Sequence, residues 1–239
     1  MSETAKGPGG KTETVARTLL VAFFVSLVCS SLVASAAVLL KPRQVANALL
    51  DMRRNILDVA GLLDPERDVD ELYESIERRV VDLETGAYLE ETDSDTGPER
   101  AFVYLVRQDG EVSKIILPVS GYGLWSTLYG FLALEADANT VADITFYAHG
   151  ETPGLGDFIS KPAWRKLWRN KRVFDDSGDL KIEVIKGRVP ADDPLADYRV
   201  DGVSGATLTG NGVTKLLQHW LGDDGYGPYL RNLRQGDGP

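Results

Sequence analysis

Residues 101–119, AFVYLVRQDGEVSKIILPV, indicate the fold class most clearly. This stretch contains two apolar runs, 101–107 and 114–119, which lie on either side of a polar segment that includes Asp109 and Gly110. Two apolar, β-branched runs around an Asp-Gly pair are typical of a β-hairpin. The stretch therefore predicts two paired antiparallel strands.

Further strands and helices are expected toward the C-terminus. The strands are expected at 128–135, 141–147, 181–185 and 198–200, and the helices at 162–169 and 211–221. Strands joined by hairpins, with the helices in separate segments, are typical of an α+β domain on a mostly antiparallel sheet. This is the predicted fold class of the main domain, which we expect at residues 99–239.

Toward the N-terminus, residues 18–40 read TLLVAFFVSLVCSSLVASAAVLL and carry no charge. At about 1.5 Å per residue, a helix of this length crosses the roughly 30 Å hydrocarbon core of a membrane. A secretory signal peptide is the alternative, because Ala34-Ser35-Ala36 resembles a cleavage site. We favour a transmembrane anchor, because the apolar run continues to Leu40 and ends at Lys41, as a stop-transfer segment does. The basic residues on the two sides of the segment do not decide its orientation.

The residues between this segment and the hairpin suggest a helical spacer that packs on the main domain. We expect the N-terminal tail at 1–17, the transmembrane helix at 18–40 and the spacer at 41–98. Apolar residues recur at helical spacing up to Val59, a break follows at 61–67, and the same spacing then continues to Leu83. The spacing predicts one long helix, followed by a second helix or turn.

Composition excludes several classes of function. The chain has 239 residues and a net charge of −10, so we do not expect it to bind nucleic acid. The one cysteine, Cys29, lies in the apolar segment, which excludes an internal disulfide and an iron–sulfur cluster held by this chain alone. With two histidines, no metal site is predicted. The basic run at 164–172 is interpreted as a solvated helix face, with Trp164 and Trp168 on its buried side.

The glycine-rich segment DGVSGATLTGNG, residues 201–212, directly precedes the expected last helix. Backbone N–H groups at a helix N-terminus attract anions, so a phosphate is a suitable ligand. The alternative is an ordinary helix cap, with Thr209 or Asn211 as the N-cap residue.

Two more segments could contact a flat ligand. HGETPGLG, residues 149–156, allows close backbone approach and offers Glu151 and Thr152 as polar contacts; a plain Pro-Gly turn is the alternative. SGYGLWSTLYG, residues 120–130, interleaves aromatic and small residues that could stack on a ring; an aromatic core beneath a loop is the alternative.

Together these segments resemble the FMN-binding domains. The order of GYGLWSTLYGFLALE, GETPGLGDF, SGATLTGNGV and LGDDGYGPYL, after a single N-terminal anchor, is similar to the NqrC family, the C-type subunits of sodium-translocating NADH:quinone reductases. The G-type subunit of the ferredoxin-linked Rnf complexes shares two of these motifs and represents the alternative family. A membrane-tethered binding module without a redox role is the alternative from another class.

The resemblance implies a covalent FMN and its contacts. FMN would be joined through a phosphoester to Thr207 by a separate flavin transferase, for which Asp201 opens the recognition segment. The implied cofactor-binding residues are Ser204, Gly205, Ala206, Thr207 and Thr209 around the phosphate, and Trp125, Glu151, Thr152, Gly154 and Leu155 around the isoalloxazine ring. No residue is expected to be catalytic.

The resemblance also implies a role and a location. The chain would pass electrons from a membrane iron–sulfur centre toward a second flavin subunit and ubiquinone, in a membrane complex of six subunits whose other members are of types A, B, D, E and F. It would cross the bacterial inner membrane once, with the soluble domain in the periplasm.

Overall fold

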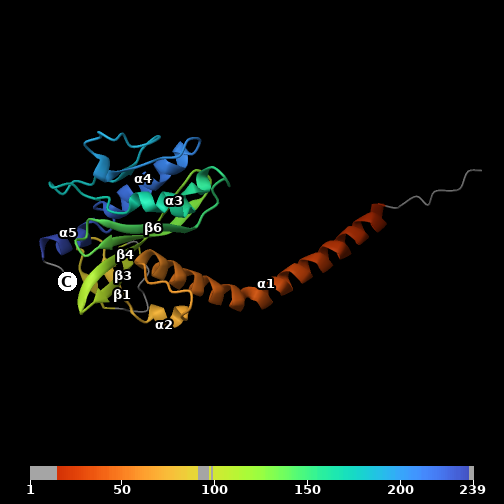
Figure 1. Ribbon diagram of the computed structural model, residues 1–239. Coiled ribbons are helices and arrows are strands. Elements are labelled where there is room, and N and C mark those ends of the chain that lie inside the picture. Colours follow the sequence, from red (N-terminus) through yellow and green to blue (C-terminus); the bar gives the residue numbers. More distant parts are fainter. Residues whose placement is uncertain (1–14, 91–96, 98, 237–239) are drawn as a thin grey trace, which may run out of the picture. The chain divides into compact units, whose positions relative to one another are not determined.

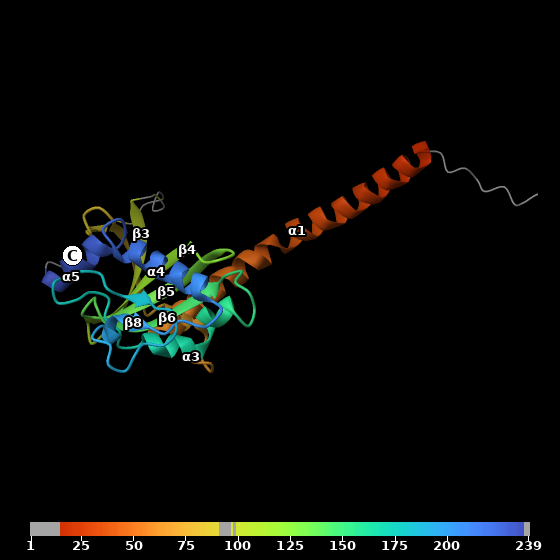
Figure 2. The same ribbon diagram turned by 90° about the horizontal axis from the view of Figure 1, so that it is seen from above.

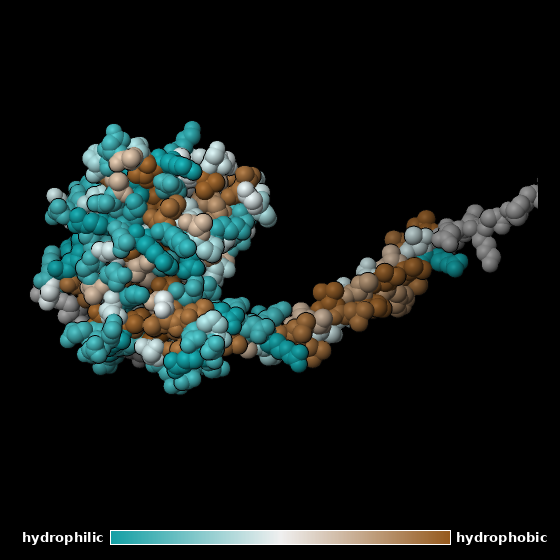
Figure 3. Space-filling view, viewed as in Figure 1, coloured by the Kyte–Doolittle hydropathy of each residue, from teal (hydrophilic) through white to brown (hydrophobic). Residues whose placement is uncertain are grey.

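The computed structural model describes residues 15–90, 97 and 99–236, and the chain divides into two units, 1–49 and 50–239. The predicted tail at 1–17 lies mostly outside the described residues. Helix α1 (Val15–Ala60) is continuous through both units and contains Pro42 (Figure 1). Its apolar stretch is a candidate membrane span, with a mean hydropathy of 2.3 over the best window. Figure 3 shows this stretch as apolar surface along the helix.

Helix α1 ends where the sequence predicted a break. Gly61 follows Ala60 with a φ of 73°, and the carbonyl of Ala60 accepts a 2.7 Å hydrogen bond from Lys114 Nζ. The short helix α2 (Val69–Tyr73) comes next, with Asp68 as its N-cap. The expectation that helical spacing continues to Leu83 is wrong, because Ile76–Asp82 forms strand β1.

Strand β1 misled the sequence interpretation because its burial is not strictly alternating. Ile76, Val80 and Val81 are all buried, and the first two are four residues apart, as on a helix. Pairing with β3 decides the conformation, with Ile76 opposite Val106 and Asp82 opposite Arg100. Helix propensity and spacing give way to such tertiary pairing.

The main sheet has six strands, all antiparallel, in the order β2-β1-β3-β4-β5-β6. The remaining strands are β2 (Tyr88–Leu89), β3 (Arg100–Gln108), β4 (Glu111–Tyr122), β5 (Thr127–Glu135) and β6 (Val141–Ala148). The predicted hairpin is confirmed, and its two-residue turn has positive φ at Asp109 (54°) and Gly110 (89°), as the right-handed twist of a hairpin favours. The α+β class is confirmed.

Both faces of the sheet are covered (Figures 1 and 2). On one face, Ile56, Leu57 and Val59 of α1 pack with sheet residues such as Ile116 and Phe131. The other face packs against α4 (Thr207–Leu221), α5 (Gly227–Gln235) and the segment with α3 (Pro162–Arg165) and the 3₁₀ turn η2 (Lys166–Trp168). A second sheet pairs β7 (Glu183–Val184) with β8 (Arg199–Val200) in parallel, and the remaining 3₁₀ turns are η1 (Gly156–Ser160) and η3 (Ala196–Tyr198).

The basic run at 164–172 is only partly a solvated face. Trp164 and Trp168 are buried as predicted. Arg165 is not solvated, because its side chain is 15% exposed and forms ion pairs with Asp58 (2.6 Å) and Asp143 (3.3 Å).

Candidate functional site

The three glycine-rich segments meet at the carboxylate of Glu151. Its Oε1 atom accepts hydrogen bonds from the backbone N–H groups of Leu124 and Trp125, both at 3.0 Å. Its Oε2 atom accepts a 2.6 Å hydrogen bond from the Thr209 hydroxyl. One side chain therefore joins the β4–β5 turn, the loop after β6 and the first turn of α4.

Glu151 is 4% exposed and Thr209 is 1% exposed, so these contacts are made away from water. Burial by itself raises the pKa of Glu151. The hydrogen bonds from Thr209 and from the backbone amides of Trp125 and Leu124 outweigh burial, and the pKa of Glu151 stays below its ordinary value. The group is therefore ionised at neutral pH. The resemblance implied that Glu151 contacts the ring, whereas both its oxygens face protein donors.

Two glycines make room for this carboxylate. A Cβ atom on Gly123 would lie 2.5 Å from Glu151 Oε1. A Cβ atom on Gly156 would lie 2.8 Å from Glu151 Oε2 and 2.8 Å from Thr209 Oγ1. Real Cβ atoms are not found at such distances, so side chains at these positions would displace the carboxylate.

Helix α4 begins at Thr207, four residues earlier than the sequence predicted. The alternative of a helix cap at Thr209 or Asn211 is wrong, because the Thr209 hydroxyl is bonded to Glu151 and Asn211 lies inside the helix. The expected glycine turn is present at Ser204 and Gly205, whereas Gly210 and Gly212 lie inside α4 and allow it to pack closely. A Cβ atom on Gly212 would lie 2.7 Å from the carbonyl oxygen of Tyr122.

The N-terminus of α4 has no side-chain cap. The residue at the N-cap position is Ala206, which forms no side-chain hydrogen bond there. Among the described residues, the Thr207 hydroxyl has no hydrogen-bond partner, and Thr207 is only partly buried. The first N–H groups of the helix and a free hydroxyl therefore lie together.

The segment that leads into α4 is held at Asp201 and open near Thr207. The carbonyl of Asp201 accepts a 2.8 Å hydrogen bond from Trp164 Nε1, and its Oδ1 atom accepts one of 2.8 Å from the N–H of Val189. Ser204 and Gly205 are exposed, and Gly205 has a φ of 82°, a conformation that disfavours other residues.

The loop after β6 presents Leu155. Its N–H donates a 3.1 Å hydrogen bond to the carbonyl of Thr152, and Gly154 between them has a φ of 76°. These are features of a type II turn with Pro153 and Gly154 at its centre. Leu155 is 46% exposed, and its Cδ2 atom lies 3.4 Å from where a Cβ atom on Gly205 would be. The turn therefore places an exposed apolar side chain next to the segment before Thr207.

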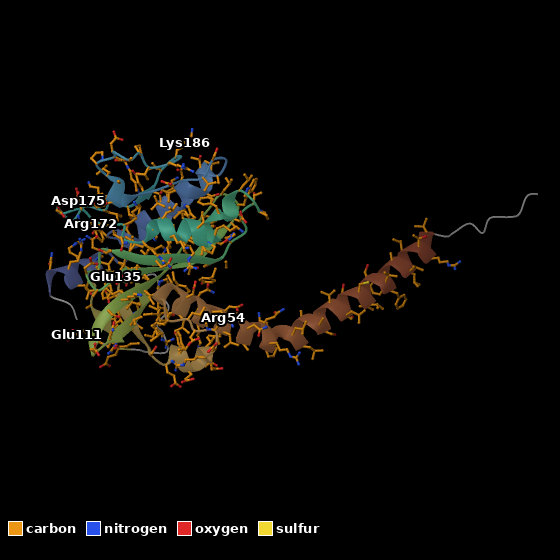
Figure 4. All side chains as sticks on the ribbon, viewed as in Figure 1. Arg54, Glu111, Glu135, Arg172, Asp175 and Lys186 are labelled. Atoms are coloured by element: carbon orange, nitrogen blue, oxygen red, sulfur yellow. The ribbon has the colours of Figure 1, made fainter. Side chains whose placement is uncertain are left out.

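The β4–β5 turn presents further apolar side chains. Tyr122 is 81% exposed and Trp125 is 70% exposed, so the alternative of an aromatic core beneath this loop is wrong. The turn lies at the opposite end of these strands from Glu111 and Glu135, which Figure 4 labels. Exposed aromatic faces beside an uncapped helix N-terminus suit a ligand with a planar ring and a phosphate.

Comparison with known proteins agrees with this geometry. Residues 123–222 match the model of the FMN-binding domain family, and this range contains the segments 149–156 and 201–212 and all but the first three residues of the segment 120–130. The chain is 47% identical to the C-type subunit of the Na(+)-translocating NADH-quinone reductase of Pseudomonas aeruginosa, over 94% of this chain and 98% of that protein. It is 44% identical to the protein of the same name from Yersinia pestis, over 94% and 95% of the two chains.

Two solved structures have the same fold. The crystal structure of Shewanella oneidensis NqrC is 32% identical, with a TM-score of 0.69 over 77% of this chain and 97% of that one. The crystal structure of the C-type subunit of the Na(+)-translocating NADH-quinone reductase from Parabacteroides distasonis is 31% identical, with a TM-score of 0.68 over 80% and 96%. These likenesses decide against the Rnf-type family and against a module without a redox role.

Proposed function

This chain belongs to the NqrC family, the C-type subunits of Na(+)-translocating NADH-quinone reductases, and has an FMN-binding domain, and we propose that it carries FMN bonded through a phosphoester to Thr207. As a subunit of that reductase, it would relay electrons within the complex.

The observation that carries the proposal is the start of α4. A phosphate on Thr207 would lie at the end of a helix whose N-cap, Ala206, supplies no acceptor. The free N–H groups of the first turn can donate to phosphate oxygens, and the helix dipole favours their negative charge. The residues present therefore fit a phosphoester at this position.

The rest of the site suits the ring. The exposed side chains of Trp125 and Leu155 come from two different segments, and Glu151 links Trp125 to the start of α4. Gly154, Thr152, Ser204 and Gly205 are also exposed, so their backbone groups can approach a ligand. These residues would orient the ring and shield one side of it from water.

FMN can hold one or two electrons, which suits a relay between one-electron and two-electron carriers. We place this relay between a membrane iron–sulfur centre and a second flavin subunit, on the way to ubiquinone. Subunits of types A, B, D, E and F would complete the complex. Residues 18–40 would anchor the chain in the bacterial inner membrane, with the FMN-binding domain in the periplasm, where covalent attachment prevents loss of the cofactor.

A separate flavin transferase would make the bond at Thr207. The proposal assigns this reaction to no residue of this chain. Asp201 would open the segment that the transferase recognises. Ser204, Gly205 and Leu208 are exposed on the surface around Thr207, as a modifying enzyme requires.

The test is co-expression with a flavin transferase, followed by full denaturation, gel fluorescence and intact mass. We expect one fluorescent band that carries one FMN-sized mass increment. Thr207→Val keeps the size of the side chain and should abolish both signals. Ser204→Ala, which removes the exposed hydroxyl three residues earlier, tests the position, and fragment masses locate the increment. An increment on Ser204, or none while the transferase modifies another substrate, would refute attachment at Thr207.

A further inference from the structure

The hydrogen bonds of Glu151 bridge long distances in sequence. Leu124, Trp125 and Thr209 are 27, 26 and 58 residues away from Glu151. Leu124 and Trp125 lie in the β4–β5 turn, which presents Trp125, and Thr209 lies in the first turn of α4, which presents Thr207. The loop of Glu151 itself presents Leu155. Because one carboxylate accepts from both neighbouring segments, it fixes how far apart those segments lie.

The carboxylate is also enclosed by its neighbours. A Cβ atom on Gly123 would lie against its Oε1 atom, and a Cβ atom on Gly156 would lie against its Oε2 atom. Leu128 Cδ2 lies 2.8 Å from where the Cβ atom on Gly123 would be. Among the described residues, no cation forms a salt bridge with Glu151, so hydrogen bonds alone compensate its charge. A buried carboxylate held in this way tolerates little movement of its donors, because losing any one of them leaves charge uncompensated.

We propose that Glu151 is a positioning residue, whose buried carboxylate holds the β4–β5 turn and the start of α4 in register and so sets the shape of the FMN site before FMN is attached. The identity of the ligand rests on the proposed function above. The contacts that carry the inference lie within the protein and exist without the ligand.

This role differs from a contact with the ring. A residue that touches the ring acts only when FMN is present. Glu151 would act in the flavin-free chain, by limiting motion of Trp125 relative to Thr207. Its removal should therefore have an effect that can be measured on backbone amides without any cofactor.

The chain offers a matched control in Asp137, in the β5–β6 turn. Asp137 Oδ1 accepts from the N–H groups of Asn139 (2.9 Å) and Thr140 (2.7 Å), and its Oδ2 atom accepts from the Thr140 hydroxyl (2.6 Å). Like Glu151, it accepts from backbone amides and from one threonine hydroxyl. All donors to Asp137 are local, so its loss should not disturb the FMN site.

The first measurement is hydrogen exchange of the full flavin-free chain in detergent, for Glu151→Ala, Glu151→Gln and Asp137→Ala. We expect the amides of Leu124 and Trp125 to exchange about tenfold faster or more in Glu151→Ala, as loss of a charged acceptor implies. Glu151→Gln keeps an acceptor without its charge and should fall between this variant and the unaltered chain. Asp137→Ala should accelerate exchange only at Asn139 and Thr140.

The second measurement is visible circular dichroism of the same variants after flavin attachment. A loosened site should weaken the signal of the attached flavin in Glu151→Ala, with partial recovery in Glu151→Gln and no change in Asp137→Ala. Exchange at Leu124 and Trp125 at the unaltered rate in both Glu151 variants would overturn the inference. If only Glu151→Gln folds, its exchange rates decide in the same way. Failure of the proposed function is separate, because it would show as a missing mass increment in the unaltered chain.

Discussion

Arg165 and Asp58 form a 2.6 Å ion pair across 107 residues of sequence, joining α3 to the end of α1. Arg165 also donates a 2.7 Å hydrogen bond from Nε to the carbonyl of Ile144 and pairs with Asp143 at 3.3 Å. The side chain of Asp143 is 8% exposed, and Arg169 lies 2.9 Å from it. A partly buried network of two acids and two bases therefore fastens the final turns of α1 to the domain.

The first prediction concerns the two acids of this network. Asp143→Ala removes the buried acid of the network, while Arg165 keeps Asp58 and the Ile144 carbonyl, so it should lower the free energy of unfolding by about 1–3 kcal/mol. Asp58 is 39% exposed, so solvent replaces much of its contribution, and Asp58→Ala should cost about 1 kcal/mol or less. Urea unfolding of the detergent-solubilised chain, followed by tryptophan fluorescence, measures both. An equal loss of unfolding free energy in the two variants would contradict this prediction.

The second prediction concerns the N-terminal segment. The apolar run of residues 18–40 continues beyond Ala36, and α1 passes through this point without a break. We therefore expect expression in a bacterial host to leave the segment uncleaved. Intact mass of the chain, purified through a C-terminal tag, should include residues 1–36. A control chain with an established signal peptide in place of those residues should be shortened. A mass that begins at Ala37 would identify the segment as a signal peptide.

The hairpin was predictable because its signals are local. Asp109 and Gly110 lie next to each other, and both have the positive φ that such a pair favours. The first strand of the sheet was not predictable in this way. Ile76 and Val80 have helical spacing, and only their pairing with Val106 and Phe102, which lie far along the chain, makes them part of a strand.

The site was predictable in its parts but not in its connections. The segments around Trp125, Glu151 and Thr207 were identified from their motifs. The hydrogen bond between Glu151 and Thr209 could not be, because nothing local indicates contact across 58 residues. The same limit left a helix cap at Thr209 open as an alternative, since the partner of its hydroxyl lies far along the chain.

The third prediction is a pH dependence that involves Tyr226. Its hydroxyl lies 3.0 Å from the carbonyl oxygen of Phe102 and 3.2 Å from that of Pro118. Burial, with a smaller effect of nearby Tyr104, raises the pKa of Tyr226 far above its ordinary value of 10.0. In the unfolded chain the phenol loses its proton near pH 10, while the folded chain keeps it. Above pH 10 the unfolded state therefore binds fewer protons, and stability falls as pH rises.

Tyr226→Phe removes this titration. The difference in stability between the variant and the unaltered chain should therefore depend on pH. Near pH 7 the variant should be less stable by about 1–2 kcal/mol, because two carbonyl groups lose their donor. Above pH 10 the difference should shrink, by up to about 1.4 kcal/mol per pH unit. Urea midpoints of both chains at neutral and alkaline pH test this. A difference that stays constant above pH 10 would mean that Tyr226 ionises alike in both states.

The last prediction compares two glycines of α4 that face different neighbours. A Cβ atom on Gly212 would lie 2.7 Å from the carbonyl oxygen of Tyr122 and 2.9 Å from the Cα atom of Gly123, and backbone cannot move aside cheaply. A Cβ atom on Gly210 would lie 3.1 Å from Val184 Cγ1, a side chain that can shift slightly. Both substitutions by alanine gain about 1 kcal/mol of helix propensity.

At Gly212 the destabilisation from the close contacts of an added Cβ atom should therefore exceed the gain in helix propensity. At Gly210 it should not. We expect Gly212→Ala to lower the free energy of unfolding by about 1–2 kcal/mol after this offset, and Gly210→Ala to be nearly neutral. Because the contact of Gly212 is with the start of the β4–β5 turn, Gly212→Ala should also push α4 away from Trp125. Slower flavin attachment at Thr207, the proposed attachment site, in Gly212→Ala than in Gly210→Ala would show this displacement. Equal attachment rates, with only stability changed, would mean that the strain relaxes elsewhere in α4.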